Sequence, residues 1–176
     1  MLDDSSAWKD WSRAGPKVPN QPNVFVGYFA GRWNFLLAKK GGPVRGQPSM
    51  EHALLIEMAS PETRDEACKP HLTTDIRRFY TNGRCVVRPD WEQVRDAVLW
   101  ELLLEKYGVT PGTDNKERAE SRMLLIDTHP AYLEDGNVSC DNWFGCCRCP
   151  NCKRELGINM HGRFLQKLRA LLINPK

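Results

Sequence analysis

Apolar side chains recur along this chain at two spacings, one typical of helices and one typical of strands. The β-branched and aromatic run from Val24 to Phe29 predicts a strand, and Tyr132 to Glu134 predicts a second, shorter one. Helical segments are predicted at 50–59, from a restart at Ser60-Pro61, at a short piece that Thr73 or Thr74 caps and that runs through Tyr80, at 90–107, at 115–126 and at 160–173. The chain is therefore predicted to be α+β and mostly helical.

Residues that begin and end helices flank several of these segments. Ser49 is suited to cap the helix over 50–59, and Asp90 with Gln93 three residues later resembles a capping box. Gly108 is placed to end the helix that Asp90 begins. The side chains predicted to face a core are Leu54, Leu55 and Met58, then Trp91, Val94, Val98 and Leu102, and finally Phe164, Leu165, Leu168, Leu171 and Leu172.

Proline, glycine and cysteine divide the chain into three regions. Residues 1–22 are polar and broken by prolines, which predicts an extended N-terminal arm. Residues 23–176 are predicted to form one compact domain. Within that domain the stretch around 140–156 has no periodicity and carries five of the seven cysteines, so it is predicted to be a Cys-rich loop.

Composition narrows the functional classes without choosing one. The 176 residues are 41% hydrophobic and 27% charged, which fits a single domain with a core. Lys and Arg exceed Asp and Glu by 25 to 22, too small a bias for an avid duplex binder. No apolar run reaches the roughly 18–20 residues of a membrane span, and the N-terminus lacks a signal-peptide pattern. We therefore expect a cytoplasmic or nuclear monomer with reduced thiols and no membrane partner.

Carboxylates at three places are candidates for acid–base chemistry. Glu51 falls in the first turn of a predicted helix, where the helix dipole stabilises a negative charge. Asp141 precedes Trp143, Phe144 and a glycine, and an acid packed against rings tends to have the raised pKa of a general acid. Glu134 ends the second predicted strand. The alternative is that each is an ordinary helix-end or solvated loop charge.

The cysteines offer a possible metal site. Cys149 and Cys152 have the CxxC spacing that grips a tetrahedral zinc ion, and Cys147 lies close by. Cys140, Cys146 or His161 are the alternatives for completing the set. A set of reduced, partly buried thiols is the competing interpretation. A redox CxxC is less favoured, because no strand–helix pattern surrounds it.

Aromatic and glycine-flanked positions indicate a ligand site. Asn159 is a good N-cap, and the glycines on either side of it could leave room for a phosphate or a ribose hydroxyl. The chain is also rich in rings that could stack on a purine or pyridine. These are Trp33, Phe35, Trp91, Trp143 and Phe144.

Taken in order, these motifs resemble the NADAR family, which includes the YbiA-like proteins. The resemblance runs from about Phe25 to Arg169. It is carried by Gly31 to Phe35, Ser49-Met50-Glu51-His52, Arg88-Pro89-Asp90-Trp91, Lys106-Tyr107, Tyr132-Leu133-Glu134, Asp141 to Gly145, and Gly157, Asn159, Gly162 and Leu165. A run like Cys147 to Cys152 also occurs in some relatives. The sequence departs from the family at Met58, which stands where a lysine is usual, and at Phe144 and Trp33, where Trp and Ser are usual.

The resemblance implies a YbiA-like domain that cleaves N-glycosidic bonds. The substrates implied are ADP-ribose on guanine bases of nucleic acid, which we favour, or phosphoribosylated intermediates of riboflavin synthesis. A binder of ADP-ribose or nucleic acid without turnover is a further alternative, and so is a zinc-stabilised interaction module whose Cys-rich loop is the working surface. No cofactor is expected for the chemistry, and a structural zinc is a possible addition.

The resemblance also implies which side chains serve the site. The expected catalytic residues are Glu51, Asp141 and Glu134, with Lys39 or Lys40 as substitutes for the lysine absent at Met58. The expected ligand-binding residues are Arg32, Trp33, Asn34, Phe35, His52, Trp91, Trp143, Phe144, Gly145 and Asn159.

Overall fold

The structure is a computed structural model in which residues 23–25, 43–69, 79–80, 82–137, 140–147, 149–152 and 157–174 are described. The chain divides into two compact units. Unit 1 consists of Met1–Leu36 and Ser121–Lys176, and unit 2 consists of Leu37–Glu120. The predicted arm over 1–22 lies outside the described residues, as does most of the predicted helix that ends at Tyr80.

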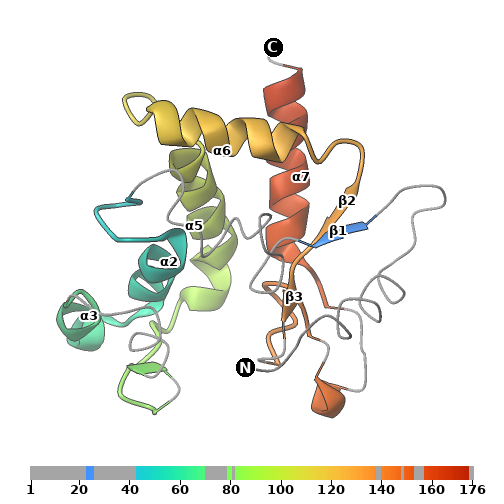
Figure 1. Cartoon of the computed structure of the whole chain (residues 1–176). Coiled ribbons are helices and arrows are strands. Elements are labelled where there is room, and N and C mark those ends of the chain that lie inside the picture. Colours follow the sequence, from blue (N-terminus) through green and yellow to red (C-terminus); the bar gives the residue numbers. More distant parts are fainter. Residues whose placement is uncertain are drawn as a thin grey trace, which may run out of the picture. The chain divides into compact units, whose positions relative to one another are not determined.

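Helices predominate among the elements, with short strands between them (Figure 1). In chain order they are β1 (Asn23–Phe25), α2 (Met50–Met58), α3 (Pro61–Ala67), α5 (Trp91–Lys106), α6 (Lys116–Ile126), β2 (Tyr132–Glu134), β3 (Gly136–Asn137), β4 (Cys146–Cys147), the 3-10 helix η2 (Pro150–Cys152) and α7 (Met160–Ile173). The predicted α+β class is confirmed, and so are most of the predicted helix positions.

In unit 2, α2 packs against α5 (Figure 1). Arg45, in the loop before α2, forms ion pairs with an acid on each of these helices. The guanidinium of Arg45 lies 2.7 Å from Glu57 on α2 and 2.7 Å from Glu101 on α5. The backbone N–H of Arg45 also donates to Glu105 at 2.7 Å. A single exposed ion pair contributes little, but one cation shared by acids on two helices fixes their register.

The buried face of α2 differs from the predicted one. Leu54 is buried as expected, but Leu55 and Met58 are only half-buried, whereas Glu51 and His52 are buried. The Ser49 hydroxyl accepts from the His52 N–H at 3.3 Å and lies 2.9 Å from His52 Nδ1. These hydrogen bonds allow the polar first turn of α2 to be buried. The spacing of apolar residues alone does not predict the burial of polar ones.

The two helix caps predicted in unit 2 have different outcomes. Ser49 caps α2 as expected. The prediction of a capping box at Asp90 is wrong, because the Asp90 side chain makes no capping hydrogen bond. Its two carboxylate oxygens instead accept from the Arg88 guanidinium at 2.6 and 2.8 Å. An arginine two residues away offers a charge-assisted fork that outcompetes a backbone N–H.

In unit 1, α7 packs along β2 (Figure 1). β1 pairs with β2 in parallel, with Phe25 opposite Glu134, and β3 pairs with β4 in parallel. Leu165 and Leu168 of α7 are fully buried, as predicted. Arg169 anchors the same helix by donating to the Thr128 hydroxyl and the Ala131 carbonyl, each at 2.8 Å.

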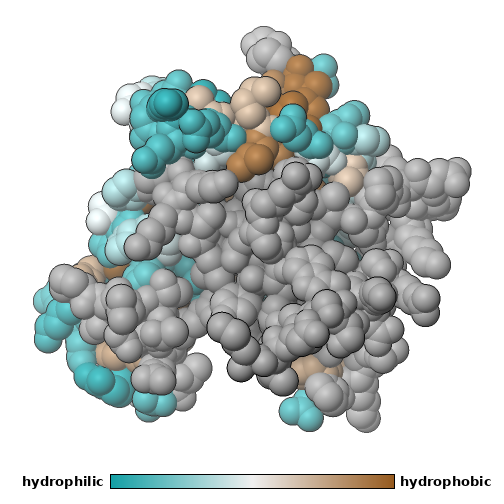
Figure 2. Space-filling view, viewed as in Figure 1, coloured by the Kyte–Doolittle hydropathy of each residue, from teal (hydrophilic) through white to brown (hydrophobic). Residues whose placement is uncertain are grey.

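The last turn of α7 is less buried than its apolar spacing predicts. Leu171 is 47% exposed and Ile173 is 37% exposed. Figure 2 shows apolar residues gathered at this end of α7. None of the helices among the described residues has the length and apolarity to cross a membrane.

Candidate functional site

Several residues predicted for the site lie outside the described part of the chain, and their roles stay predictions. They are Arg32, Trp33, Asn34, Phe35, Lys39 and Lys40. The other predicted site residues divide between the two units: Glu51, His52 and Trp91 belong to unit 2, and those from Glu134 onward belong to unit 1.

Glu51 is a nearly buried carboxylate at the positive end of a helix. It is 7% exposed and occupies the first turn of α2, directly after the Ser49 cap. The N-terminal N–H groups of a helix stabilise a negative charge there. In the same unit Trp91, also buried, begins α5, the helix on which α2 packs. The alternative interpretation, a solvated charge at a helix end, predicts an exposed side chain, whereas Glu51 is buried.

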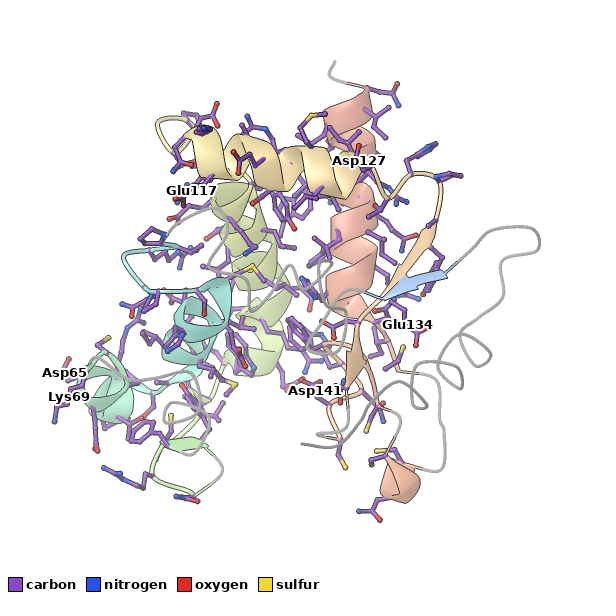
Figure 3. The ribbon with its side chains drawn as sticks, viewed as in Figure 1. Asp65, Lys69, Glu117, Asp127, Glu134 and Asp141 are labelled. Atoms are coloured by element: carbon purple, nitrogen blue, oxygen red, sulfur yellow. The ribbon has the colours of Figure 1, made fainter. Side chains whose placement is uncertain are left out.

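A second group of buried polar side chains lies at the end of β2 in unit 1. Glu134, labelled in Figure 3, is fully buried, and Asp135 next to it is also buried. Asp135 Oδ2 lies 2.6 Å from Nδ1 of His161, which is 0% exposed. Within the described part of the chain, His161 Nε2 is buried with no hydrogen-bond partner.

The pairing of His161 with Asp135 is a feature that the sequence analysis missed. From the sequence His161 was an alternative zinc ligand, and the structure favours Cys140 instead, because the cluster of close ligand atoms consists of four cysteines and does not include His161. The available signal was its spacing: His161 precedes the buried Leu165 and Leu168 by four and seven residues, which places a histidine on the core face of α7.

The two aromatic residues after Asp141 occupy different environments. Phe144 is buried and stacks on the His161 ring, with centroids 4.7 Å apart and an interplanar angle of 25°. Trp143 is half-buried and lies 6.1 Å from Phe144 at a tilt of 57°. Phe144 therefore orients the imidazole from within unit 1, and Trp143 is the more accessible ring of the two.

Asp141 begins a tight turn instead of packing beneath these rings. Its side chain is exposed, and Oδ1 accepts from the backbone N–H groups of Trp143 at 3.1 Å and Phe144 at 2.8 Å (Figure 3). The packing expected from the sequence is therefore wrong, since the short Asp side chain bonds to its own turn first. What remains is an accessible carboxylate with a fixed orientation.

The turn formed by residues 141–145, called the 141–145 turn below, covers the N-terminus of α7. Its carbonyl oxygens accept the N–H groups that open the helix, which pairs Asn142 with Ile158, Gly145 with Asn159, Trp143 with Met160, and Phe144 with His161, at 2.6–3.3 Å. These contacts satisfy donors that a helix cannot satisfy internally. The start of α7 is thus bonded to the protein's own turn.

Close packing explains the glycines around this turn. A Cβ on Gly145 would lie well under 3.0 Å from the Asp135 carbonyl oxygen, and one on Gly157 would overlap the Gly145 carbonyl in the same way. At Gly162 the obstacle is the Leu133 carbonyl. The expected phosphate pocket beside these glycines is therefore wrong at these positions, because backbone of the chain itself fills the space.

Asn159 links α7 to β2. It stands at the N-cap position with a left-handed φ of 56°, yet its side chain makes no capping bond, contrary to the prediction. Instead Oδ1 accepts from the Asp135 N–H at 3.0 Å, and Nδ2 donates to the Leu133 carbonyl at 2.9 Å and the Tyr132 hydroxyl at 3.0 Å. Both amide hydrogens are used within the protein, which leaves one acceptor lone pair for the predicted ligand contact.

Four cysteines of unit 1 form a compact cluster that could hold a metal ion. The sulfur atoms of Cys140, Cys147, Cys149 and Cys152 all lie within 4.8 Å of one another. Of the two predicted alternatives for a fourth thiol, Cys140 joins the cluster. Cys146 does not, since its sulfur points to the Gly157 carbonyl at 3.8 Å. Hydrogen bonds from Cys140, then Cys147, lower the pKa of Cys149 to about 6, which favours a thiolate at neutral pH.

Lys106 is a second residue that the sequence analysis did not single out for chemistry. It ends α5 in unit 2 and is only 2% exposed. Burial, and then the charge of Arg118, lower the pKa of its ammonium group to about 8. A lysine at a helix C-terminus is ordinarily a solvated charge. Its apolar neighbours in the sequence indicated burial instead, since Leu102, Leu103 and Tyr107 are all buried.

The architecture matches a solved structure. No family model matches the chain, and no curated protein matches it. The NMR structure of the E. coli protein YbiA aligns with a TM-score of 0.62 over 91% of this chain and 91% of that chain, at 20% identity. The chain has the YbiA fold. At this identity the likeness to YbiA establishes the architecture, and the activity has to be argued from the residues.

Proposed function

We propose that the protein is an N-glycosidase that hydrolyses the bond between ADP-ribose and guanine bases of nucleic acid, releasing ADP-ribose and restoring the base. The observation that carries the proposal is the burial of Glu51 in the first turn of α2. Support also comes from the YbiA fold and from the order of the motifs along the chain. A carboxylate held out of bulk water at a helix N-terminus is suited to face a developing positive charge.

The proposed reaction uses carboxylates in two roles. Cleavage of an N-glycosidic bond passes through an oxocarbenium-like state, with positive charge on the ribose. Glu51 is proposed to stabilise that charge, and Asp141 is proposed from its motif to give a proton to the departing guanine nitrogen. The role of Asp141 rests on the order of the motifs along the chain, since its side chain is exposed and not packed against the rings. Water then adds to the ribose C1′ and returns a proton to Asp141. Glu134 is the third proposed carboxylate, and Arg32, Trp33, Phe35 and Trp91 are proposed to hold the phosphates and rings of the substrate.

A lysine could provide a covalent route to the same products. In that route a lysine amine attacks the ribose C1′ and displaces guanine, whose nitrogen takes a proton as the C1′–N bond breaks. The ribose ring then opens to an imine with the lysine, and water hydrolyses the imine to free the lysine and release ADP-ribose. Such an amine must be uncharged, which the lowered pKa of Lys106 favours and which Lys39 or Lys40 would need to acquire locally. Borohydride added during turnover would reduce the imine, and peptide mapping of the adduct would identify the lysine.

We also propose that the four-cysteine cluster holds a structural Zn²⁺ ion. Four thiolates complete the tetrahedral coordination that zinc prefers in structural sites, and they leave no position for a catalytic water. The metal therefore has no part in the glycosidic step. Metal analysis should find one zinc per chain, retained in Cys68→Ser, whose thiol is exposed in unit 2, and lost in Cys152→Ser.

A substrate panel tests the proposed activity. The wild-type protein is incubated with a guanine-ADP-ribosylated oligonucleotide, and chromatography follows the released ADP-ribose. Release with recovery of unmodified guanine supports the proposal. The methionine at position 58, where the family has lysine, favours a binder as the second candidate. Calorimetric binding of ADP-ribose without release would support that candidate, and release only from phosphoribosylated pyrimidines would support the riboflavin-pathway alternative.

A further inference from the structure

The four-cysteine cluster is joined directly to the 141–145 turn. Two of its members flank that turn, Cys140 immediately before it and Cys147 two residues after it. The Cys140 N–H donates to the Cys147 sulfur at 3.2 Å, and the Cys147 N–H donates to Oδ1 of Asn142, within the turn, at 3.0 Å. The ends of the turn are therefore brought together at the cluster.

From the turn, contacts continue to the buried acids at the end of β2. The Cys146 N–H donates to the Asp135 carbonyl at 2.7 Å, and the Asn137 side chain donates to the Asp141 carbonyl at 2.7 Å. β3 and β4 add only two paired residues each. Strands of this length do not hold a register by themselves, so another constraint is needed to keep the turn in place.

A third set of contacts leads from the turn to His161. The Phe144 carbonyl accepts the His161 N–H at 3.0 Å, and the Phe144 ring stacks on the imidazole. Asp135 holds the other edge of that imidazole. Displacement of the turn would therefore move the ring that stacks on His161 and the Asp141 carboxylate together.

The cluster has the dimensions and donors of a zinc–thiolate site. A tetrahedral zinc with bonds of about 2.3 Å places its sulfurs about 3.8 Å apart, and all four sulfurs here lie within 4.8 Å of one another. The Cys149 N–H also donates to the Cys147 sulfur, at 3.4 Å, a contact that stabilises an anionic ligand. Cys140 adopts a left-handed φ of 61°, which is unfavourable for a non-glycine residue unless its surroundings enforce it.

We propose that zinc bound by Cys140, Cys147, Cys149 and Cys152 holds the 141–145 turn in place, so that substrate binding depends on the metal although the metal takes no part in the reaction. The expectation that substrate binding depends on the metal rests on the proposed N-glycosidase function. The effect of the metal on the turn does not rest on that function. The four sulfurs act as positioning groups, and the three sets of contacts carry their effect to Asp141, Asp135 and His161.

Amide hydrogen exchange measured by NMR tests the effect on the turn. In the zinc-loaded protein the N–H groups of Phe144 and Cys146 should be protected, since they donate to Asp141 and Asp135. Chelation of the metal should speed their exchange about tenfold or more, and added zinc should restore it. The control is the Tyr107 N–H, bonded within unit 2 to the Leu103 carbonyl at 3.0 Å, whose exchange should not change.

Variants at Cys152 separate metal binding from loss of one side chain. This residue lies in η2 and is partly exposed, so a different ligand can be placed there. Cys152→His keeps four zinc ligands and should keep both the metal and the protection of Phe144. Cys152→Ser should lose both, and Cys68→Ser should match the wild type.

Three results would overturn the inference: no zinc bound at one per chain, unchanged protection of Phe144 and Cys146 after chelation, or equal loss of protection at Tyr107. The last would mean that the metal supports the whole fold. Calorimetry with ADP-ribose is read separately: affinity should fall about tenfold or more without zinc. If the zinc-loaded protein neither binds nor cleaves while the exchange results hold, the proposed function fails and the positioning by zinc stands.

Discussion

Replacing Lys106 by methionine should make the protein more stable at neutral pH. The lysine is 2% exposed, and burial with the nearby Arg118 lowers its pKa from 10.5 to about 8. Each tenfold change in proton affinity is worth about 1.4 kcal/mol, so holding this ammonium group in the folded protein costs about 3 kcal/mol at pH 7. Methionine fills a similar unbranched volume without the charge.

The lowered pKa of Lys106 also determines in which direction the stability of the wild type changes with pH. Below about pH 8 Lys106 is charged in both folded and unfolded chains, and the full cost is present. Between about pH 8 and the unfolded value of 10.5, the unfolded chain binds more protons, so the free energy of unfolding rises with pH. The wild type should therefore gain stability relative to Lys106→Met over this range.

Urea denaturation of both proteins at about pH 7 and about pH 10 measures the difference. We expect Lys106→Met to be more stable by about 1–3 kcal/mol at pH 7, because Lys106 also takes part in an interaction that offsets part of the gain. The advantage should shrink by about pH 10. Lys116→Met, at an exposed position of α6, is the control and should change little. A less stable Lys106→Met at both pH values would refute the reasoning.

Two further substitutions, Gly157→Ala and His161→Leu, test the packing around the 141–145 turn, and Gly83→Ala in unit 2 is the control for the first. Gly157→Ala should lower the unfolding free energy by about 3 kcal/mol or more, because its Cβ overlaps the Gly145 carbonyl. Gly83→Ala should cost only about 1–2 kcal/mol, since only its left-handed φ of 69° opposes the change. Equal losses in the two variants would show that the overlap relaxes. His161→Leu should cost about 3 kcal/mol by removing the imidazole bonded to Asp135, and a calorimetric unfolding temperature at or above the wild-type value would contradict this.

Local signals in the sequence predicted the helices well. The Ser49 cap and the bounds of α7 depend on residues within a turn or two of each other, so cap chemistry and spacing suffice. Which face of α2 is buried depends on what packs around it. Spacing alone therefore identified Leu54 but not the burial of Glu51.

The candidate site was predictable in its residue types and less so in their contacts. Cys147, Cys149 and Cys152 were identified from their spacing. Cys146 and Cys147 are neighbours on β4, where successive side chains point to opposite faces, so the exclusion of Cys146 depends on which of the two faces the cluster. Asp135 and His161 are 26 residues apart in sequence, and no local pattern joins them. These contacts were not predicted because they join segments that are far apart in the sequence. No regular spacing of residues in a single sequence indicates such a contact.

The rate of ADP-ribose release by Glu51→Gln tests the central claim most directly. The substitution keeps the size of the side chain and one acceptor oxygen but removes the charge proposed to face the oxocarbenium state. Glu62→Gln is the matched control, since Glu62 lies in the first turn of α3 and is exposed. With a guanine-ADP-ribosylated oligonucleotide, kcat should fall about 10²–10³-fold for Glu51→Gln and should not change for Glu62→Gln. Near-normal turnover by a folded Glu51→Gln would contradict the account.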